Sequence, residues 1–220
     1  TVLTGLAGGL VSSTAVSLSF ARQSRTDPTA VAADALAAGI LAAWSLMFLR
    51  VIVIVAIVNR ALLPTLAGPF AAMALAAALM GAVFYVRGLS RRDVSASGEA
   101  LLVRNPFSLG AAIQFALLFA LVLVVVALAR QYAPVSGLYL VAALAGLTEM
   151  DAITLSLAQG AHDGDGFAVA TQAIGIAALT NTVAKCVLVA ALGRGPLRLR
   201  LAGATLLLVA CAALVAWLVV

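Results

Sequence analysis

Long apolar segments alternate with short polar connectors along the whole chain. A helix needs about 20 apolar residues to cross a bilayer. The alternation inside short strands that marks an outer-membrane barrel is absent from the sequence. The pattern therefore predicts an all-α membrane protein with about seven transmembrane helices. The predicted helices cover residues 3–21, 33–58, 65–86, 107–129, 137–158, 167–192 and 201–219.

Composition supports this class. The 220 residues are 65% hydrophobic and 10% charged, with a mean hydropathy of +1.19. Soluble domains average about 45–50% apolar and about 25% charged residues. The net charge of +5 comes from arginines in the connectors, where it favours contact with the lipid bilayer over binding of nucleic acid. These arginines divide five against six between alternate connectors, so they do not set the membrane orientation. Thr1 already lies in an apolar segment, and we expect the chain to be part of a longer protein.

The first and last thirds of the chain resemble each other. Residues 9–21 align with residues 146–158, with identical Gly, Leu, Ala, Leu, Ser and Ala positions. A shift of two in the following segment pairs Ser45 with Thr180 and Arg50 with Lys185. The alternative is a chance match between two segments rich in alanine, glycine and leucine, but the paired basic residues argue against it.

The alignment predicts three parts. These are a first three-helix repeat at 1–86, a polar loop and linker helix at 87–130, and a second three-helix repeat at 131–220. Four segments separate the related helices, so with seven crossings both repeats point the same way, as two parallel three-helix repeats.

Two carboxylates lie near the middle of the fifth predicted helix. A charge at this depth costs at least about 2.5–3.5 kcal/mol on insertion scales, and it normally marks a function or a partner. In a regular helix Glu149 and Asp151 point about 200° apart. Both can reach one cavity only where the helix is broken or several partners surround it. Gly146, and three glycines in the first segment, permit a break, and glycine-interrupted spans at matching positions of two repeats point to a transporter site.

Neutral and basic groups complete the predicted site. Asn181 and Lys185 are four residues apart on one face of the sixth segment, and Arg50 is the counterpart of Lys185. Lys185 and Arg50 are predicted as charge partners or gates. Buried ion pairs are also retained for packing alone, so a purely structural role is the alternative. The predicted ion-binding residues are Glu149, Asp151, Asn181, Thr180, Ser12, Ser13 and Thr14.

Other chemistry finds little support. His162 has no Cys or His at ligand spacing, which argues against zinc, and its neighbours Asp163 and Asp165 fit a solvated loop. The carboxylates would suit Mg²⁺ or a proton, so the identity of any metal is open. No nucleophile set or cofactor motif is present, and we predict neither an enzyme nor a bound cofactor.

Several motifs resemble a known family. They are residues 5–19 (GLAGGLVSSTAVSLS), 47–50 (MFLR), 105–107 (NPF), 151–156 (DAITLS) and 181–185 (NTVAK). The chain resembles the C-terminal domain of MgtC/SapB family proteins, a bacterial membrane domain without a described activity. The resemblance covers nearly the whole chain and implies a multi-pass protein of the bacterial inner (plasma) membrane that follows an MgtC/SapB-type domain. Glu149 stands where this family often has Asp, which keeps the acid.

These observations predict a transporter or channel for a small cation, with proton coupling as an option, that uses the carboxylates in mid-membrane. The alternative is a non-transporting assembly or regulatory module associated with an MgtC/SapB-type domain. Expected partners are the bilayer and a small ion or solute, and a homo-oligomer is left open.

Overall fold

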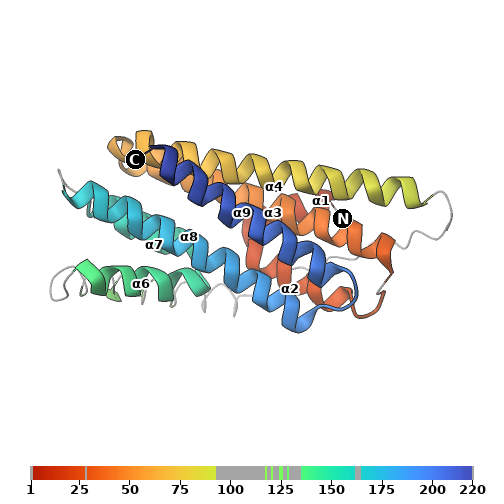
Figure 1. Ribbon diagram of the computed structural model, residues 1–220. Helices are drawn as coiled ribbons and strands as arrows, with labels where there is room; N and C mark the ends of the chain where they lie inside the picture. The colour runs from red at the N-terminus through yellow and green to blue at the C-terminus, as the bar shows by residue number, and fades with distance from the viewer. Residues whose placement is uncertain are drawn as a thin grey trace. The chain divides into compact units, whose positions relative to one another are not determined.

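The computed structural model describes residues 2–27, 29–92, 135–161 and 165–219, together with isolated positions between 117 and 128. All regular structure in these ranges is helical (Figure 1). The predicted linker helix at 107–129, most of the polar loop before it, and His162 with Asp163 lie outside the described residues. The helices are α1 (Val2–Val11), α2 (Ser13–Gln23), α3 (Ala30–Val58), the 3-10 turn η1 (Arg60–Leu62), α4 (Leu63–Arg92), α6 (Val135–Thr148), α7 (Met150–Gln159), α8 (Asp165–Leu192) and α9 (Leu197–Val219).

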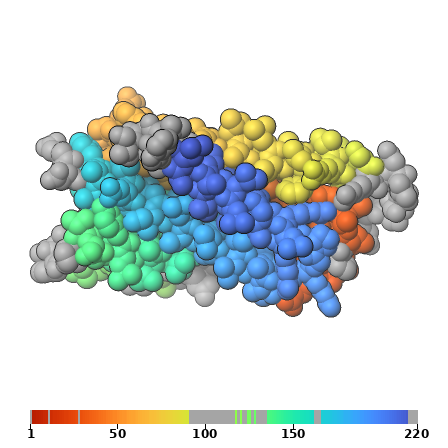
Figure 2. Space-filling view, in the orientation of Figure 1, coloured from red at the N-terminus to blue at the C-terminus, as the bar shows by residue number. Residues whose placement is uncertain are grey.

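Four of the described helical segments are long and apolar enough to cross a membrane: Ala30–Val58, Arg60–Ser90, Gly166–Leu192 and Leu197–Leu214, with mean hydropathies between 1.8 and 2.5. Large apolar side chains remain exposed along them. On α9, which lies on the face seen in Figure 2, Leu199 is 80% exposed and Leu206 is 72% exposed. Such surfaces suit contact with lipid, so the described part is an all-α membrane protein.

The chain divides into two compact units. Unit 1 contains Thr1–Leu49, Gly68–Leu102 and Val183–Val220, and unit 2 contains Arg50–Ala67 and Val103–Thr182. The long helices α3, α4 and α8 each contribute residues to both units, while α1, α2 and α9 belong to unit 1 and α6 and α7 to unit 2. The units are described in turn.

In unit 1, α1 and α2 run in opposite directions. The backbone of Gly5 lies against Gly39, and Gly9 lies against Ala43, so α1 runs parallel to α3. A side chain at either glycine would collide with α3. Along α2 the order reverses, because Trp44 donates a hydrogen bond to Ser17 at 2.9 Å while the end of α2 leads back to the start of α3. We call the pair α1–α2 hairpin 1.

Unit 2 contains a second pair of this kind. The hydroxyl of Tyr139 donates to the side chain of Gln172, and Gly146 packs against Ala177, so α6 runs parallel to α8. Helix α7 then returns and ends at Gln159, and five residues separate it from the start of α8. We call the pair α6–α7 hairpin 2.

These hairpins correct the prediction that residues 3–21 and 137–158 are single crossing helices. The four hairpin helices have 10, 11, 14 and 10 residues. At 1.5 Å per residue, ten residues reach about 15 Å, which is about half of the ~30 Å hydrocarbon core. Apolar composition alone could not show this, because a hairpin that turns back inside the membrane is as apolar as a helix that crosses it.

Both units place α3 and α8 antiparallel. In unit 1 the backbone N–H of Arg194, just after α8, donates to Ser24 at 2.8 Å, and Arg25 donates to the carbonyl of Leu192 at 2.6 Å, close to where α3 begins. In unit 2 the hydroxyls of Thr65, in the first turn of α4, and Thr171 lie 3.2 Å apart, so the connection that follows α3 lies near the start of α8. The predicted parallel orientation of these helices is therefore wrong. Its parity argument counted the fifth segment as one helix, whereas the structure breaks that segment into α6 and α7, which run in opposite directions.

Candidate functional site

The tip of hairpin 2 is a single residue of extended backbone. Glu149 has φ −147° and ψ 123°, and it separates the end of α6 from the start of α7. Its N–H donates to the carbonyl of Ala145 at 2.9 Å, and its carboxylate accepts from the N–H of Asp151 at 3.3 Å. Glu149 is thus the N-cap of α7, where a carboxylate is favoured both by the free N–H groups and by the helix dipole. The break that the glycine pattern permitted occurs at this residue.

Gly146 and α8 hold this tip in place. A Cβ on Gly146 would lie 2.5 Å from the carbonyl oxygen of Ala177 and 2.5 Å from the hydroxyl of Thr180, so only glycine fits. The Nδ2 of Asn181 donates to the carbonyl of Gly146 at 2.6 Å, and the Asn181 side chain is buried. Thr180 donates within its own helix, at 3.0 Å to Ala177. Asn181 therefore satisfies one of the carbonyls that the end of α6 leaves without a helical donor.

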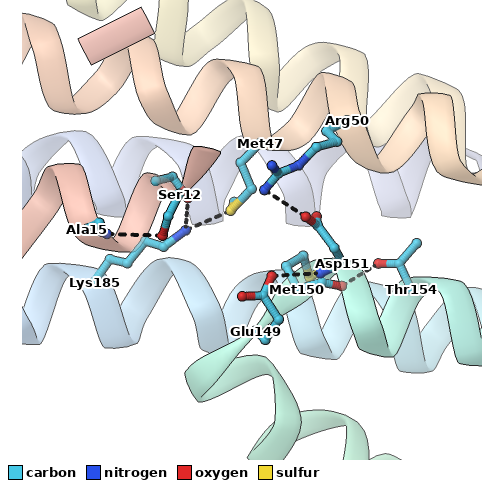
Figure 3. A network of polar contacts seen from close by, with 10 residues as sticks. Ser12, Ala15, Met47, Arg50, Glu149, Met150, Asp151, Thr154 and Lys185 are labelled. Carbon is cyan, nitrogen blue, oxygen red and sulfur yellow. Dashed lines mark hydrogen bonds and ion pairs between the residues drawn. The ribbon is translucent and has the colours of Figure 1, made fainter. Parts of the chain in front are cut away.

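Asp151 forms an ion pair with Arg50 in unit 2 (Figure 3). The NH2 group of Arg50 lies 2.8 Å from Oδ2 of Asp151, and the two side chains are 28% and 19% exposed. This is the geometry of a short, charge-assisted hydrogen bond. Arg50 was predicted as a charge partner, and the structure brings it to the carboxylate of the second repeat.

The tip of hairpin 1 has the same backbone conformation with different side chains. Ser12 has φ −161° and ψ 112°, and its hydroxyl accepts from the N–H of Ala15 at 3.2 Å, as the N-cap of α2. The ammonium of Lys185, only 3% exposed, donates to Ser13 at 2.6 Å and contacts the sulfur of Met47 at 2.7 Å (Figure 3). Thr14 follows in the first turn of α2 and is half-buried.

The two tips match the sequence alignment. Ser12 aligns with Glu149, and both are N-caps that follow a one-residue break. Arg50 aligns with Lys185, and Arg50 contacts hairpin 2 at Asp151 whereas Lys185 contacts hairpin 1 at Ser13. The residues named from the sequence therefore lie at or against the two tips. The sequence did not indicate that α3 supplies its basic residue to hairpin 2 and α8 to hairpin 1.

Sequence reasoning missed a buried ion pair in unit 1. Asp34, 1% exposed, lies 3.1 Å from NH1 of Arg200, which also donates to the carbonyl of Ala30 at 2.8 Å. The guanidinium lies 5.9 Å from the ring centre of Phe84. Both charged residues lie at the edges of apolar segments, where they resemble solvated connector charges. The position of Asp34 inside the predicted helix at 33–58 was the one signal in the sequence that could have indicated its burial.

The described ranges contain no group of three or more His, Cys, Asp or Glu side chains that could hold a metal ion such as zinc. Cys186 and Cys211 are both free thiols. The tip of hairpin 2 instead offers single carboxylates, an amide and helix-end carbonyls, which are oxygen ligands suited to a hard cation.

Comparison with known proteins gives a family without a described activity. An uncharacterized protein of Aquifex aeolicus (strain VF5) is 32% identical over 189 residues, which cover 84% of this chain and 78% of that protein. No solved structure matches the chain. The model of a domain of unknown function, DUF4010, matches residues 1–193, and the chain therefore belongs to the DUF4010 family.

Proposed function

We propose that this protein is a membrane transporter or channel for a small cation. The observation that carries the proposal is the pair of short hairpins, broken at aligned residues, with polar tips and with Arg50 or Lys185 against each. Non-helical backbone inside a membrane is tolerated where it is buried in protein or lines a water-filled cavity. Discontinuous helices of this kind form the binding sites of many secondary transporters.

The architecture we infer is an inverted repeat. The first repeat comprises hairpin 1, α3 and α4, and the second comprises hairpin 2, α8 and α9. The antiparallel directions of α3 and α8, seen separately in each unit, support this inversion. It requires one further crossing between α4 and α6, and the apolar segment at 107–129, outside the described residues, is long enough to supply it.

The preference for a cation comes from hairpin 2. Two carboxylates lie within three residues at its tip, and the last carbonyls of α6 lie at the same turn. A cation arriving there would compete with Arg50 for Asp151, so Arg50 would act as an exchangeable internal cation. Thr180 and Asn181 would contribute neutral oxygens, and Ser12, Ser13 and Thr14 would do so at hairpin 1.

Flux through liposomes tests the proposal. The full protein would be reconstituted and the uptake of Na⁺, K⁺, Mg²⁺ and protons measured for wild type, Glu149→Gln and Asp151→Asn. We expect flux of one cation above empty liposomes, lost in at least one folded variant. Arg60→Gln serves as a matched control, because Arg60 is exposed and donates only to the carbonyl of Ala56 in the preceding turn. The absence of flux for every ion would refute the proposal.

A second candidate is a module that assembles with another membrane domain, such as the MgtC/SapB-type domain that the sequence resemblance implies in a bacterial inner membrane. The two ion pairs, Arg50–Asp151 and Arg200–Asp34, favour it because such pairs also specify helix pairing. Apolar replacement of both members of the Arg50 pair would then preserve assembly, whereas a cation transporter would lose its flux.

A further inference from the structure

Asn181 carries a buried oxygen that the described residues leave unsatisfied. The side chain is 2% exposed, and its Nδ2 donates to the carbonyl of Gly146 at 2.6 Å. A carbonyl accepts only from a donor, so this contact fixes which end of the amide is nitrogen. The Oδ1 is therefore the remaining end, and in the described part of the chain it accepts no hydrogen bond. Buried polar atoms are nearly always satisfied, so an orphaned acceptor calls for a donor or a cation.

The position of this oxygen indicates its ligand. The amide lies against Gly146, three residues before the tip residue Glu149. The last carbonyls of α6 lack donors from their own helix, and of these Ala145 and Gly146 are occupied by Glu149, Thr148 and Asn181. This one turn of the chain therefore carries several acceptors. They are the carbonyls of the final two residues of α6, the oxygen of Asn181 and the carboxylate of Glu149.

We propose that the tip of hairpin 2 binds a dehydrated monovalent cation of the size of Na⁺. Its ligands are Oδ1 of Asn181, the carboxylate of Glu149 and carbonyl oxygens from the end of α6. The proposal rests on the proposed function and names its coupling ion. A single carboxylate surrounded by neutral oxygens matches one positive charge. Divalent ions in proteins rely on more carboxylates or on retained water, and no cluster of three acidic or other ligating side chains occurs in the described ranges.

The experiment separates the oxygen of Asn181 from its nitrogen. The full protein in lipid nanodiscs would be titrated with NaCl, at constant ionic strength with choline chloride, while ²²Na⁺ binding and the melting temperature are followed. Asn181→Leu removes both ends of the amide. Asn181→Asp keeps an oxygen and loses the donor to Gly146. We expect the apparent Kd for Na⁺ to rise at least tenfold in Asn181→Leu, which corresponds to about 1.4 kcal/mol, and to stay within about threefold of wild type, or to fall, in Asn181→Asp.

Asn59 provides the matched control. It lies in the same unit, and its Nδ2 also donates to helix-end carbonyls, those of Ala158 at 3.1 Å and Ala161 at 3.0 Å. Its oxygen, however, is occupied by the N–H of Ala61 at 3.3 Å. Asn59→Leu should lower the melting temperature with and without Na⁺ and leave the Na⁺ affinity unchanged. A variant that loses a structural amide is thereby distinguished from one that loses a ligand.

Two results would overturn the site. One is wild-type Na⁺ affinity in Asn181→Leu, and the other is equal stabilisation of the wild type by Na⁺, K⁺ and choline. If Asn181→Leu does not fold, Glu149→Gln takes its place, with the same tenfold loss expected. The site and the proposed function fail separately. Na⁺ binding without flux of any ion would support the site and refute transport. Flux that needs no Na⁺ would support transport and refute the site.

Discussion

Substitution of Arg50 by methionine, which keeps an unbranched apolar stem and removes the charged guanidinium, tests the ion pair at hairpin 2. With charges 2.8 Å apart, the Coulomb energy is about 6 kcal/mol at an effective dielectric constant of about 20. The cost of removing both ions from water offsets much of this attraction. The side chains are 28% and 19% exposed, so the pair is neither fully buried nor at the surface. We expect a coupling energy of about 2 kcal/mol, between the ~0.2–1 kcal/mol of surface pairs and the larger values of buried ones.

A double-mutant cycle measures this coupling. Free energies of unfolding in mixed micelles would be compared for wild type, Arg50→Met, Asp151→Leu and the double variant. Each single variant leaves one charge without its partner. The double variant should therefore lose less free energy of unfolding than the sum of the two single losses. The second cycle replaces Arg50→Met with Arg60→Met. Arg60 is exposed and, among the described residues, donates only to the carbonyl of Ala56 near the end of α3, at 3.3 Å, so no coupling is expected there. A coupling below about 0.5 kcal/mol between Arg50 and Asp151, or an equal one for Arg60, would refute the reasoning.

Three further predictions follow from packing, burial and topology. Gly146→Ala places a Cβ 2.5 Å from a backbone carbonyl of α8 and should cost about 1–3 kcal/mol of unfolding free energy. As its control, Gly175→Ala meets nothing within 4 Å and should be neutral or stabilising by up to about 1 kcal/mol. Equal effects of the two substitutions would contradict the packing of Gly146 against α8. Asp34→Asn should cost about 3 kcal/mol, because it strands a guanidinium at a side chain only 1% exposed, and no change in thermal unfolding would show that the pair is dispensable. Single cysteines at Thr26 and Gln159, in a cysteine-free background, should react with an impermeant maleimide from opposite sides of the membrane, and labelling from one side would restore the seven-crossing topology.

The sequence was sufficient for the structural class but not for the topology, and the internal repeat stays a prediction. Apolar length and low charge identified a helical membrane protein, since no other backbone can satisfy its polar groups in lipid. Whether a segment crosses or turns back depends on one residue, Ser12 or Glu149, that adopts an extended conformation. Hydropathy averaged over about twenty residues does not change when one residue adopts an extended conformation. Gly5 and Gly9 carried part of the signal, because close approach to α3 requires the absence of a Cβ.

The candidate residues were identified from the free-energy cost of placing a charge inside a membrane. Glu149, Asp151, Lys185 and Arg50 stand out because charge in an apolar segment is expensive, and the structure places each at or against a hairpin tip. The pairing of Arg50 with Asp151 could not be derived, because it depends on which helices are neighbours. Asp34 was overlooked because a charge near a helix end is cheap when the end is solvated. Its burial becomes evident only once Arg200 is brought beside it.

The polar contacts at the two hairpin tips have a mechanical consequence. Hairpin 1 is bonded to Lys185 on α8 and hairpin 2 to Arg50 on α3, so each tip moves away from that long helix only by breaking a polar contact. The two contacts would respond differently to a cation. At hairpin 2 the proposed cation, bound at Glu149 two residues from Asp151, would repel the guanidinium of Arg50 and so weaken its ion pair with Asp151. At hairpin 1 the acceptor is the hydroxyl of Ser13, which holds a cation far less strongly than a carboxylate does. The proposed inverted repeat would therefore have one ionic and one neutral tip, and its ion-dependent step would belong to hairpin 2.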